Sequence, residues 1–113
     1  MKHHLYLQIA SKLRTTILRG DYAPEQQIPS IRRLAENEKC NPATVQKAMK
    51  VLEEQNLVIS CGTLGYFVIA SEQEIKKLRY QESNKLVKIL FEKLGELNFS
   101  EDEIVNLFFR KDA

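Results

Sequence analysis

The chain has 113 residues, of which 43% are apolar and 28% are charged, and its formal net charge is +2. This length suits about one domain with an appendage, and no stretch approaches the roughly 18 consecutive apolar residues of a membrane-spanning helix. The chain starts directly with an amphipathic pattern instead of a signal-peptide core, so we expect a cytoplasmic protein.

The first predicted element is an amphipathic helix over residues 5–19, because its apolar side chains recur at helical spacing. Gly20 follows and is suited to end the helix. After a loop that extends to residue 29, the hydroxyl of Ser30 is a good N-cap for a second helix. The side chains of this second helix that are expected to face the core are Ile31, Leu34 and Ala35.

A third helix follows after a short polar turn. Asn41 is a strong N-cap, and Pro42 suits the first helical position, where no amide hydrogen is needed. The expected buried stripe of this helix is Val45, Ala48, Met49 and Leu52. Two short helices joined by a turn, the second with polar and basic residues near its start, are the components of a helix-turn-helix.

Residues 57–69 change to a β-rich composition. Two apolar runs, 57–60 and 66–69, flank a turn that contains Gly62 and Gly65, which is a hairpin signal. Three helices followed by a hairpin predict a winged helix-turn-helix in which the hairpin is the wing.

The rest of the chain returns to helix. Ser71 with Glu74, and Ser100 with Glu103, have the spacing of capping boxes. Two helices are therefore expected, with a break near residues 95–98.

These patterns predict a mainly α fold with a small β-hairpin. We expect a winged helix-turn-helix DNA-binding domain over residues 1–70 and a short two-helix dimerisation region over residues 71–113. No Pro- or Gly-rich linker separates the two parts, so the joint is expected to be stiff.

The residue types at the start of the third helix point to DNA. Gln46 can pair with an adenine edge through two hydrogen bonds, and Lys47 and Lys50 can reach guanine or phosphate. Arg32 and Arg33 open the second helix, where the helix dipole disfavours cations unless a phosphate lies nearby. The predicted DNA-contacting residues are Ser30, Arg32, Arg33, Asn41, Ala43, Thr44, Gln46, Lys47, Lys50, Gly62 and Thr63. The alternative is that this face is merely solvated.

The charge distribution agrees weakly with a nucleic-acid partner. Residues 1–69 hold nine Lys and Arg against six Asp and Glu, a net charge of 9 − 6 = +3. Residues 70–113 hold eight against nine, a net charge of 8 − 9 = −1. The basic excess lies in the half that would neutralise phosphates.

The run from Leu5 to Val68 resembles the DNA-binding domain of the GntR family of bacterial transcription regulators, through the segments IPSIRRLA, NPATVQKAMKVLE and GYFV. The short helical tail resembles the YtrA-like branch, whose small C-terminal region pairs two subunits. The resemblance implies a homodimer on a roughly palindromic double-stranded DNA operator, often near a transporter operon, with repression the commoner mode. It also implies DNA contacts by Arg32, by the start of the recognition helix with Gln46, and by the wing glycine.

The wing departs from the family pattern. Its tip, residues 60–65, lacks the basic residue that usually stands beside the first glycine, although the backbone amides of Gly62 and Thr63 could approach a phosphate. We therefore expect the wing to contribute less affinity than usual.

The apolar stripe of the tail needs a cover, which is either the chain itself or a second copy. The candidate dimer-interface residues are Phe91, Leu94, Leu97, Phe99, Ile104, Leu107 and Phe108. Small-molecule pockets occupy roughly 300–1,000 Å³, more than the tail of one subunit can enclose. An effector site between subunits stays open, and nothing indicates the effector's chemistry.

Other functional classes have less support. The chain shows no catalytic triad, no phosphate-binding glycine loop and no metal-ligand spacing, so we expect neither an enzyme nor a cofactor or metal. Cys40 and Cys61 are expected to be unrelated free thiols, with a redox role as the alternative. A winged helix that binds proteins is the closest rival, and it would expose aromatic or aliphatic anchors on its recognition face.

Overall fold

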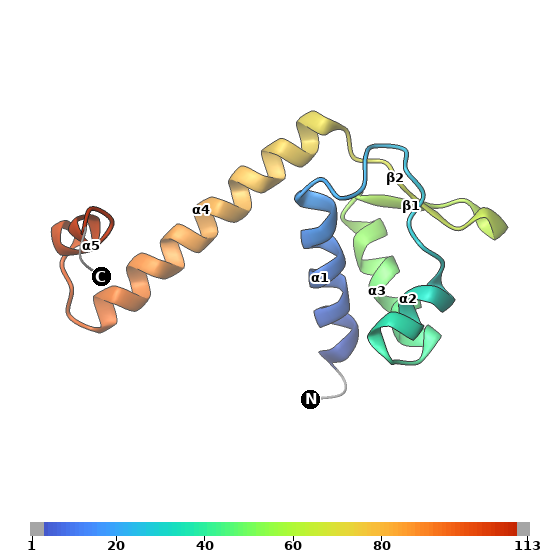
Figure 1. Cartoon of the computed structure of the whole chain (residues 1–113), viewed down its shortest axis with the longest axis horizontal. Helices are drawn as coiled ribbons and strands as arrows, with labels where there is room; N and C mark the ends of the chain where they lie inside the picture. Colours follow the sequence, from blue (N-terminus) through green and yellow to red (C-terminus); the bar gives the residue numbers. More distant parts are fainter. Residues whose placement is uncertain (1–3, 111–113) are drawn as a thin grey trace. The chain divides into compact units, whose positions relative to one another are not determined.

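Three helices and a hairpin build the first part of the chain (Figure 1). In this computed structural model, which describes residues 4–110, α1 (Leu5–Leu18) and α2 (Ile31–Glu38) both pack against α3 (Pro42–Glu54). The apolar stripes predicted from the sequence supply the contacts. Their fully or largely buried members are Ile9, Leu13, Ile17, Leu18, Leu34, Ala35, Val45, Ala48, Met49 and Leu52.

The helix starts follow the predicted caps. The Ser30 hydroxyl accepts a hydrogen bond from the Arg33 amide at 3.1 Å, and the Asn41 side-chain oxygen accepts one from the Ala43 amide at 2.8 Å. Pro42 occupies the first turn of α3. Each cap satisfies an amide that the helix itself leaves without a partner.

The helices α1 to α4 end in the same way, each at a residue of positive φ. At the turn between α2 and α3 this residue is Lys39 (φ +54°), and the following Cys40 amide donates to the Ala35 carbonyl at 3.0 Å. This arrangement is a Schellman motif, and glycine usually occupies the left-handed position. The positive-φ residues that follow these four helices are Gly20, Lys39, Asn56 and Asn98.

The wing consists of β1 (Val58–Ser60) and β2 (Tyr66–Val68), which pair antiparallel with Val58 opposite Val68. A 3₁₀ turn (Gly62–Leu64) joins them. The segment 25–28, expected to be a plain loop, pairs with the other edge of β2: the Ile28 amide donates to the Tyr66 carbonyl at 2.9 Å, and the Val68 amide donates to the Gln26 carbonyl at 3.0 Å. The pairing satisfies the outer edge of the hairpin.

Two helices follow the wing, α4 (Glu72–Glu96) and α5 (Glu101–Leu107). Both predicted capping boxes are present, as the Ser71–Glu74 and Ser100–Glu103 hydrogen bonds of 2.9–3.2 Å attest. Hydrogen bonds from Ser71 lower the pKa of the Glu74 carboxyl group. The backbone amide of Ser71 is the larger cause and its side chain is the smaller one. The predicted fold, a winged helix-turn-helix followed by two helices, is confirmed.

The chain forms two compact units that divide between Leu78 and Arg79. The first turns of α4 belong to the first unit, where Ile75 is buried in the core and Leu78 packs against it. In the second unit Ile104 is only 2% exposed.

Among the described residues 4–110, no helix combines the length and the apolar character that crossing a membrane requires.

Candidate nucleic-acid interface

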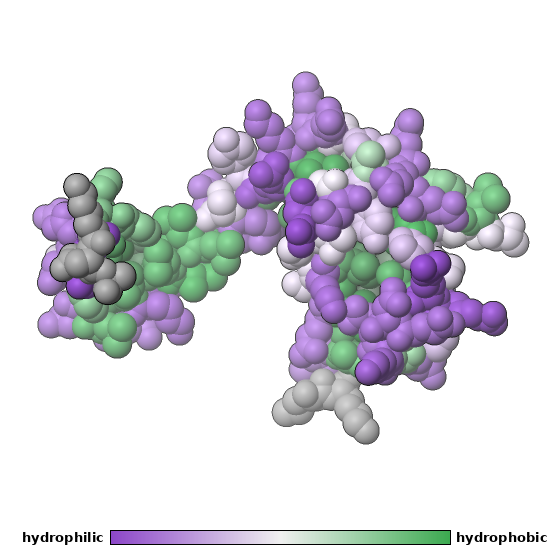
Figure 2. Space-filling view, viewed as in Figure 1, coloured by the Kyte–Doolittle hydropathy of each residue, from purple (hydrophilic) through white to green (hydrophobic). Residues whose placement is uncertain are grey.

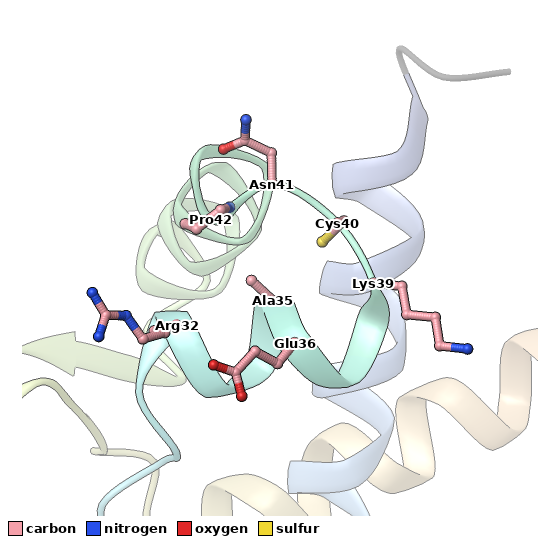
Figure 3. A pocket seen from close by; sticks show the side chains of 7 residues that line it. All are labelled: Arg32, Ala35, Glu36, Lys39, Cys40, Asn41 and Pro42. Carbon is pink, nitrogen blue, oxygen red and sulfur yellow. The ribbon is translucent and has the colours of Figure 1, made fainter.

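The turn of the helix-turn-helix forms an open depression of about 460 Å³ (Figure 3). Arg32 and Glu36 of α2 line one side of the depression, and Asn41 and Pro42 at the start of α3 line the other. Arg32 and Glu36 are one helical turn apart, so they share a face of α2. The depression therefore combines a cationic side chain with the N-terminus of the following helix, which carries partial positive charge.

The outer face of α3 is polar and accessible. Val45, Ala48 and Met49 occupy the core side at helical spacing, which turns the residues between them outward. Ala43, Gln46, Lys47 and Lys50 are exposed, and Thr44 is half-buried. The first unit by itself thus leaves the predicted recognition surface uncovered.

The start of α2 contributes three more predicted residues. Ser30, Arg32 and Arg33 are all exposed. The Ser30 oxygen already accepts the Arg33 amide, and its hydroxyl hydrogen remains able to donate to a phosphate. Neither α2 nor α3 carries an acidic residue in its own first turn, where it would offset the positive end of the helix dipole. Glu36 of α2 is the acidic residue that lines the depression at the start of α3.

Two tyrosines contact the recognition residues. The Gln46 side-chain amide lies 3.5 Å from the hydroxyl of Tyr66 on β2, a long hydrogen bond, and the Lys47 ammonium lies 5.9 Å from the ring centre of Tyr6 on α1. The latter distance is within the range of a cation–π contact. The sequence did not identify either tyrosine, because each lies far along the chain from the lysine or glutamine that it meets.

The wing places Gly62 and Thr63 on its exposed tip. The Gln27 side-chain amide donates to the Leu64 carbonyl at 2.6 Å, which ties the tip to the segment before α2. The tip carries no charged residue, so its contribution to DNA binding does not include charge neutralisation.

The predicted dimer-interface residues lie on α4, in the turn that follows it, on α5 and, for Phe108, just after the end of α5. Leu97, Phe99 and Phe108 are exposed, at 69%, 36% and 62%. Ile104 is buried within the single chain, whereas the remaining candidates are half-buried, namely Phe91, Leu94 and Leu107. Further exposed apolar residues of the second unit, not among these candidates, are Tyr80, Leu86, Val87, Ile89, Leu90, Val105 and Phe109.

Comparison with known sequences identifies the protein family. Residues 5–68, more than half of the chain, match the family described as bacterial regulatory proteins, gntR family. The chain belongs to the GntR family. The resemblance noted from the sequence is therefore confirmed, and the matched residues include α2, α3 and the wing.

The GntR-family assignment agrees with individual relatives. The protein is 33% identical over 64 residues to the HTH-type transcriptional repressor YtrA of Bacillus subtilis (strain 168), a match that covers 57% of this chain and 49% of YtrA. A GntR family transcriptional regulator from Listeria monocytogenes has a similar structure, with a TM-score of 0.84, 24% identity, and coverage of 92% of this chain and 91% of that one. That likeness shows the fold.

A second similar structure contains DNA. The AraR DNA-binding domain in complex with operator ORR3 matches with a TM-score of 0.55 and 30% identity, over 56% of this chain and 76% of that one. These relatives are regulators and not enzymes. The GntR-family protein described here is accordingly a transcription regulator with a DNA-binding domain, and not an enzyme.

The cysteines of this GntR-family protein lie at the edges of the same surface. Cys40 is half-buried in the turn before α3, Cys61 is exposed at the wing, and both are free thiols. Within residues 4–110 no group of three or more His, Cys, Asp or Glu side chains is placed to hold a metal ion.

Proposed function

We propose that this protein binds a roughly palindromic operator as a homodimer, with sequence specificity, and acts as a repressor. The observation that carries the proposal is the exposed polar face of α3, on which Gln46, Lys47 and Lys50 remain accessible. Side chains of these types read base edges in the major groove and neutralise phosphates.

The roles of the side chains follow from their positions. Arg32 lies on α2 beside the start of α3 and is proposed to contact a phosphate, together with Ser30 and the amides at the start of α3. Gln46 and Lys50 lie one helical turn apart on the outer face of α3 and are proposed to meet base edges.

The alternative of a protein-binding winged helix has less support. Within residues 31–54, all of them described, no large apolar side chain is exposed on α2 or α3. Protein interfaces depend on a few buried aromatic or aliphatic anchors, and this face offers polar and cationic groups instead.

The dimer is supported by the surface of the second unit. Leu86 and Leu90 are exposed by 64% and 38% along α4, and half-buried Leu94 follows them at helical spacing. Leu97, just after the end of α4, is 69% exposed. Figure 2 shows apolar surface gathered over this part of the chain. Contiguous apolar patches of this kind are typical of protein–protein contacts, and a two-fold dimer would present two copies of α3 to the two half-sites.

The sign of regulation and the setting are proposed by analogy. The relative YtrA is named a transcriptional repressor, and the resemblance suggests an operator near a transporter operon. Action on chromosomal DNA implies a cytoplasmic location. A small-molecule effector, if it is used, would bind between subunits.

Selection of duplexes from a random pool tests the proposal. We expect enrichment of an inverted repeat whose half-sites are separated by about one helical turn, 10–10.5 base pairs, or a multiple of it. Affinity for the selected duplex should fall steeply with salt, because phosphate contacts release counterions. Selection of no common sequence, or affinity that is insensitive to salt, would contradict the proposal.

A further inference from the structure

A core tyrosine contacts one of the candidate base-reading side chains. Tyr66 on β2 is 8% exposed and belongs to the core of the first unit. Its hydroxyl lies 3.5 Å from the side-chain nitrogen of Gln46, an exposed residue on the outer face of α3 and 20 positions earlier in the chain. The contact therefore connects the core directly to the proposed recognition surface.

Tyr66 is held in place from both sides. It pairs opposite Ser60 of β1, and on its other edge its carbonyl accepts a hydrogen bond from the Ile28 amide at 2.9 Å. The strand that carries Tyr66 thus lies between two neighbouring segments. A tyrosine has only two side-chain torsions, so a buried ring on a fixed backbone leaves the hydroxyl little freedom to move.

Gln46 has more freedom of its own. It is exposed, and a glutamine has three side-chain torsions, the last of which is broad. A base edge is read only when the amide group lies in the correct orientation. A side chain that is already oriented before binding loses less conformational entropy when it meets the DNA.

The contact with Tyr66 is compatible with reading adenine. A primary amide has one oxygen acceptor and two hydrogens on its nitrogen. Adenine is read by the amide oxygen together with one of these hydrogens. The second hydrogen points away from that edge, and the Tyr66 hydroxyl oxygen can accept it. Gln46 can therefore keep its contact with Tyr66 while it reads a base.

The orientation of the amide also decides which base is preferred. Guanine presents two acceptors in the major groove, N7 and O6, whereas adenine presents an acceptor and a donor. A freely turning amide can direct its nitrogen to either base. An amide whose nitrogen is directed to Tyr66 keeps its oxygen in a defined position, which favours the donor of adenine.

We propose that Tyr66 is a positioning residue for Gln46. Its hydroxyl orients the Gln46 amide, so that Gln46 prefers adenine at one position of each half-site. Tyr66 itself touches no base. The inference rests on the DNA-binding function proposed above, and it assigns part of the sequence specificity to a residue of the wing base that acts through α3.

Parallel selections with wild-type protein, Tyr66→Phe and Tyr22→Phe test this inference. Phenylalanine keeps the buried ring and removes only the hydroxyl, so circular dichroism should show an intact fold. Tyr22 is a matched control, since it is another tyrosine packed against the same core and lies in the loop between α1 and α2. Wild type and Tyr22→Phe should enrich the same half-sites. Tyr66→Phe should enrich the same inverted repeat with a weaker preference for adenine at one position.

Affinities for duplexes that differ only at that position measure the effect. Tyr66→Phe should discriminate adenine from guanine about fivefold less well than wild type, the fold-change of one ordinary hydrogen bond. Gln46→Ala should lose the preference, and Tyr66→Phe in the Gln46→Ala background should have no further effect, because Tyr66 acts through Gln46. The slope of affinity against salt should not change in Tyr66→Phe, since no charge is removed.

The outcomes separate the two proposals. If the wild type enriches no duplex, the DNA-binding function fails and the role of Tyr66 fails with it. If the wild type enriches an inverted repeat and Tyr66→Phe shows the same preference at every position, only the positioning role fails. Equal weakening at all positions would assign the hydroxyl to the fold instead. A further loss from Tyr66→Phe in the Gln46→Ala background would show that Tyr66 does not act through Gln46, and would also overturn the inference.

Discussion

Gly65 should be the least replaceable residue of the wing. Its backbone (φ +98°, ψ −156°) lies in a region that essentially only glycine adopts. A Cβ at this position would also stand 3.3 Å from the Gln27 side-chain nitrogen, the atom that donates to the Leu64 carbonyl. Gly65→Ala therefore strains the backbone and disturbs the hydrogen bond that anchors the tip.

The size of the effect follows from these two terms. Backbone strain costs about 1–3 kcal/mol, and a weakened hydrogen bond costs about 1 kcal/mol more. Reduced freedom of the unfolded chain offsets about 0.4–1 kcal/mol. We expect Gly65→Ala to lower the free energy of unfolding by about 2 kcal/mol in urea denaturation.

Gly62→Ala is the matched control. Gly62 also has positive φ (+62°), but a Cβ there meets nothing within 4 Å. A left-handed conformation costs alanine about 1–2 kcal/mol, and the reduced freedom of the unfolded chain again offsets part of this cost. Gly62→Ala should therefore lower the free energy of unfolding clearly less than Gly65→Ala does. In a Gln27→Ala background the penalty of Gly65→Ala should shrink, because the crowded nitrogen is gone.

Hydrogen exchange adds a local readout, since the wing can open without global unfolding. The Cys61 amide, which donates to the Gly65 carbonyl, should exchange faster in Gly65→Ala than in Gly62→Ala. Equal stabilities and equal exchange rates in the two variants would refute the argument from backbone conformation and crowding.

Four further outcomes are expected. Met49→Ala should cost about 2–5 kcal/mol of stability in urea unfolding, because the side chain is fully buried; a loss within 0.5 kcal/mol, the range of surface changes, would be inconsistent with that burial. Arg32→Ala should weaken binding to the selected duplex about tenfold or more and flatten its salt dependence at unchanged stability, and unchanged affinity would remove Arg32 from the site. Truncation after Leu78, which keeps Ile75 in the core, should produce a folded monomer in sedimentation; a persistent dimer would exclude the second unit as the dimerisation region. Ser71→Ala should raise the pKa of Glu74 only in part in an NMR titration, because alanine keeps the backbone amide that is the larger cause of the lowered pKa. Because the folded pKa is lowered, the Glu74 contribution is present above the unfolded pKa and is lost as pH falls through the folded one; an unmoved pKa in Ser71→Ala would assign the whole shift to the backbone amide.

Local sequence signals accounted for most of the elements. The capping residues Ser30, Asn41, Ser71 and Ser100 all perform their predicted role, because a cap requires only side chains within three residues of the amides that it satisfies. Helical periodicity likewise identified the buried face of α3 in full. Since burial of one face exposes the other, the location of the candidate recognition residues followed as well.

Contacts between distant segments were not predictable in the same way. The pairing of segment 25–28 with β2, and the anchoring of Leu64 by Gln27, join residues about 40 positions apart. No short-range pattern encodes such a pairing, since it depends on how the chain returns after α3. Ile75 on the first turns of α4 packs into the core of the first unit, a further contact that no local pattern predicted.

The amino-acid sequence by itself determined the helices, the hairpin, the caps and the polar face of α3, since these depend on neighbours within one or two turns. Only the tertiary structure decided how the wing is held and which of its side chains stay uncovered. Leu64 is apolar and would be expected inside, yet the Gln27 anchor and the turn at Gly65 keep it outside. Burial is a property of the whole packed chain, and a residue's own chemistry does not specify it.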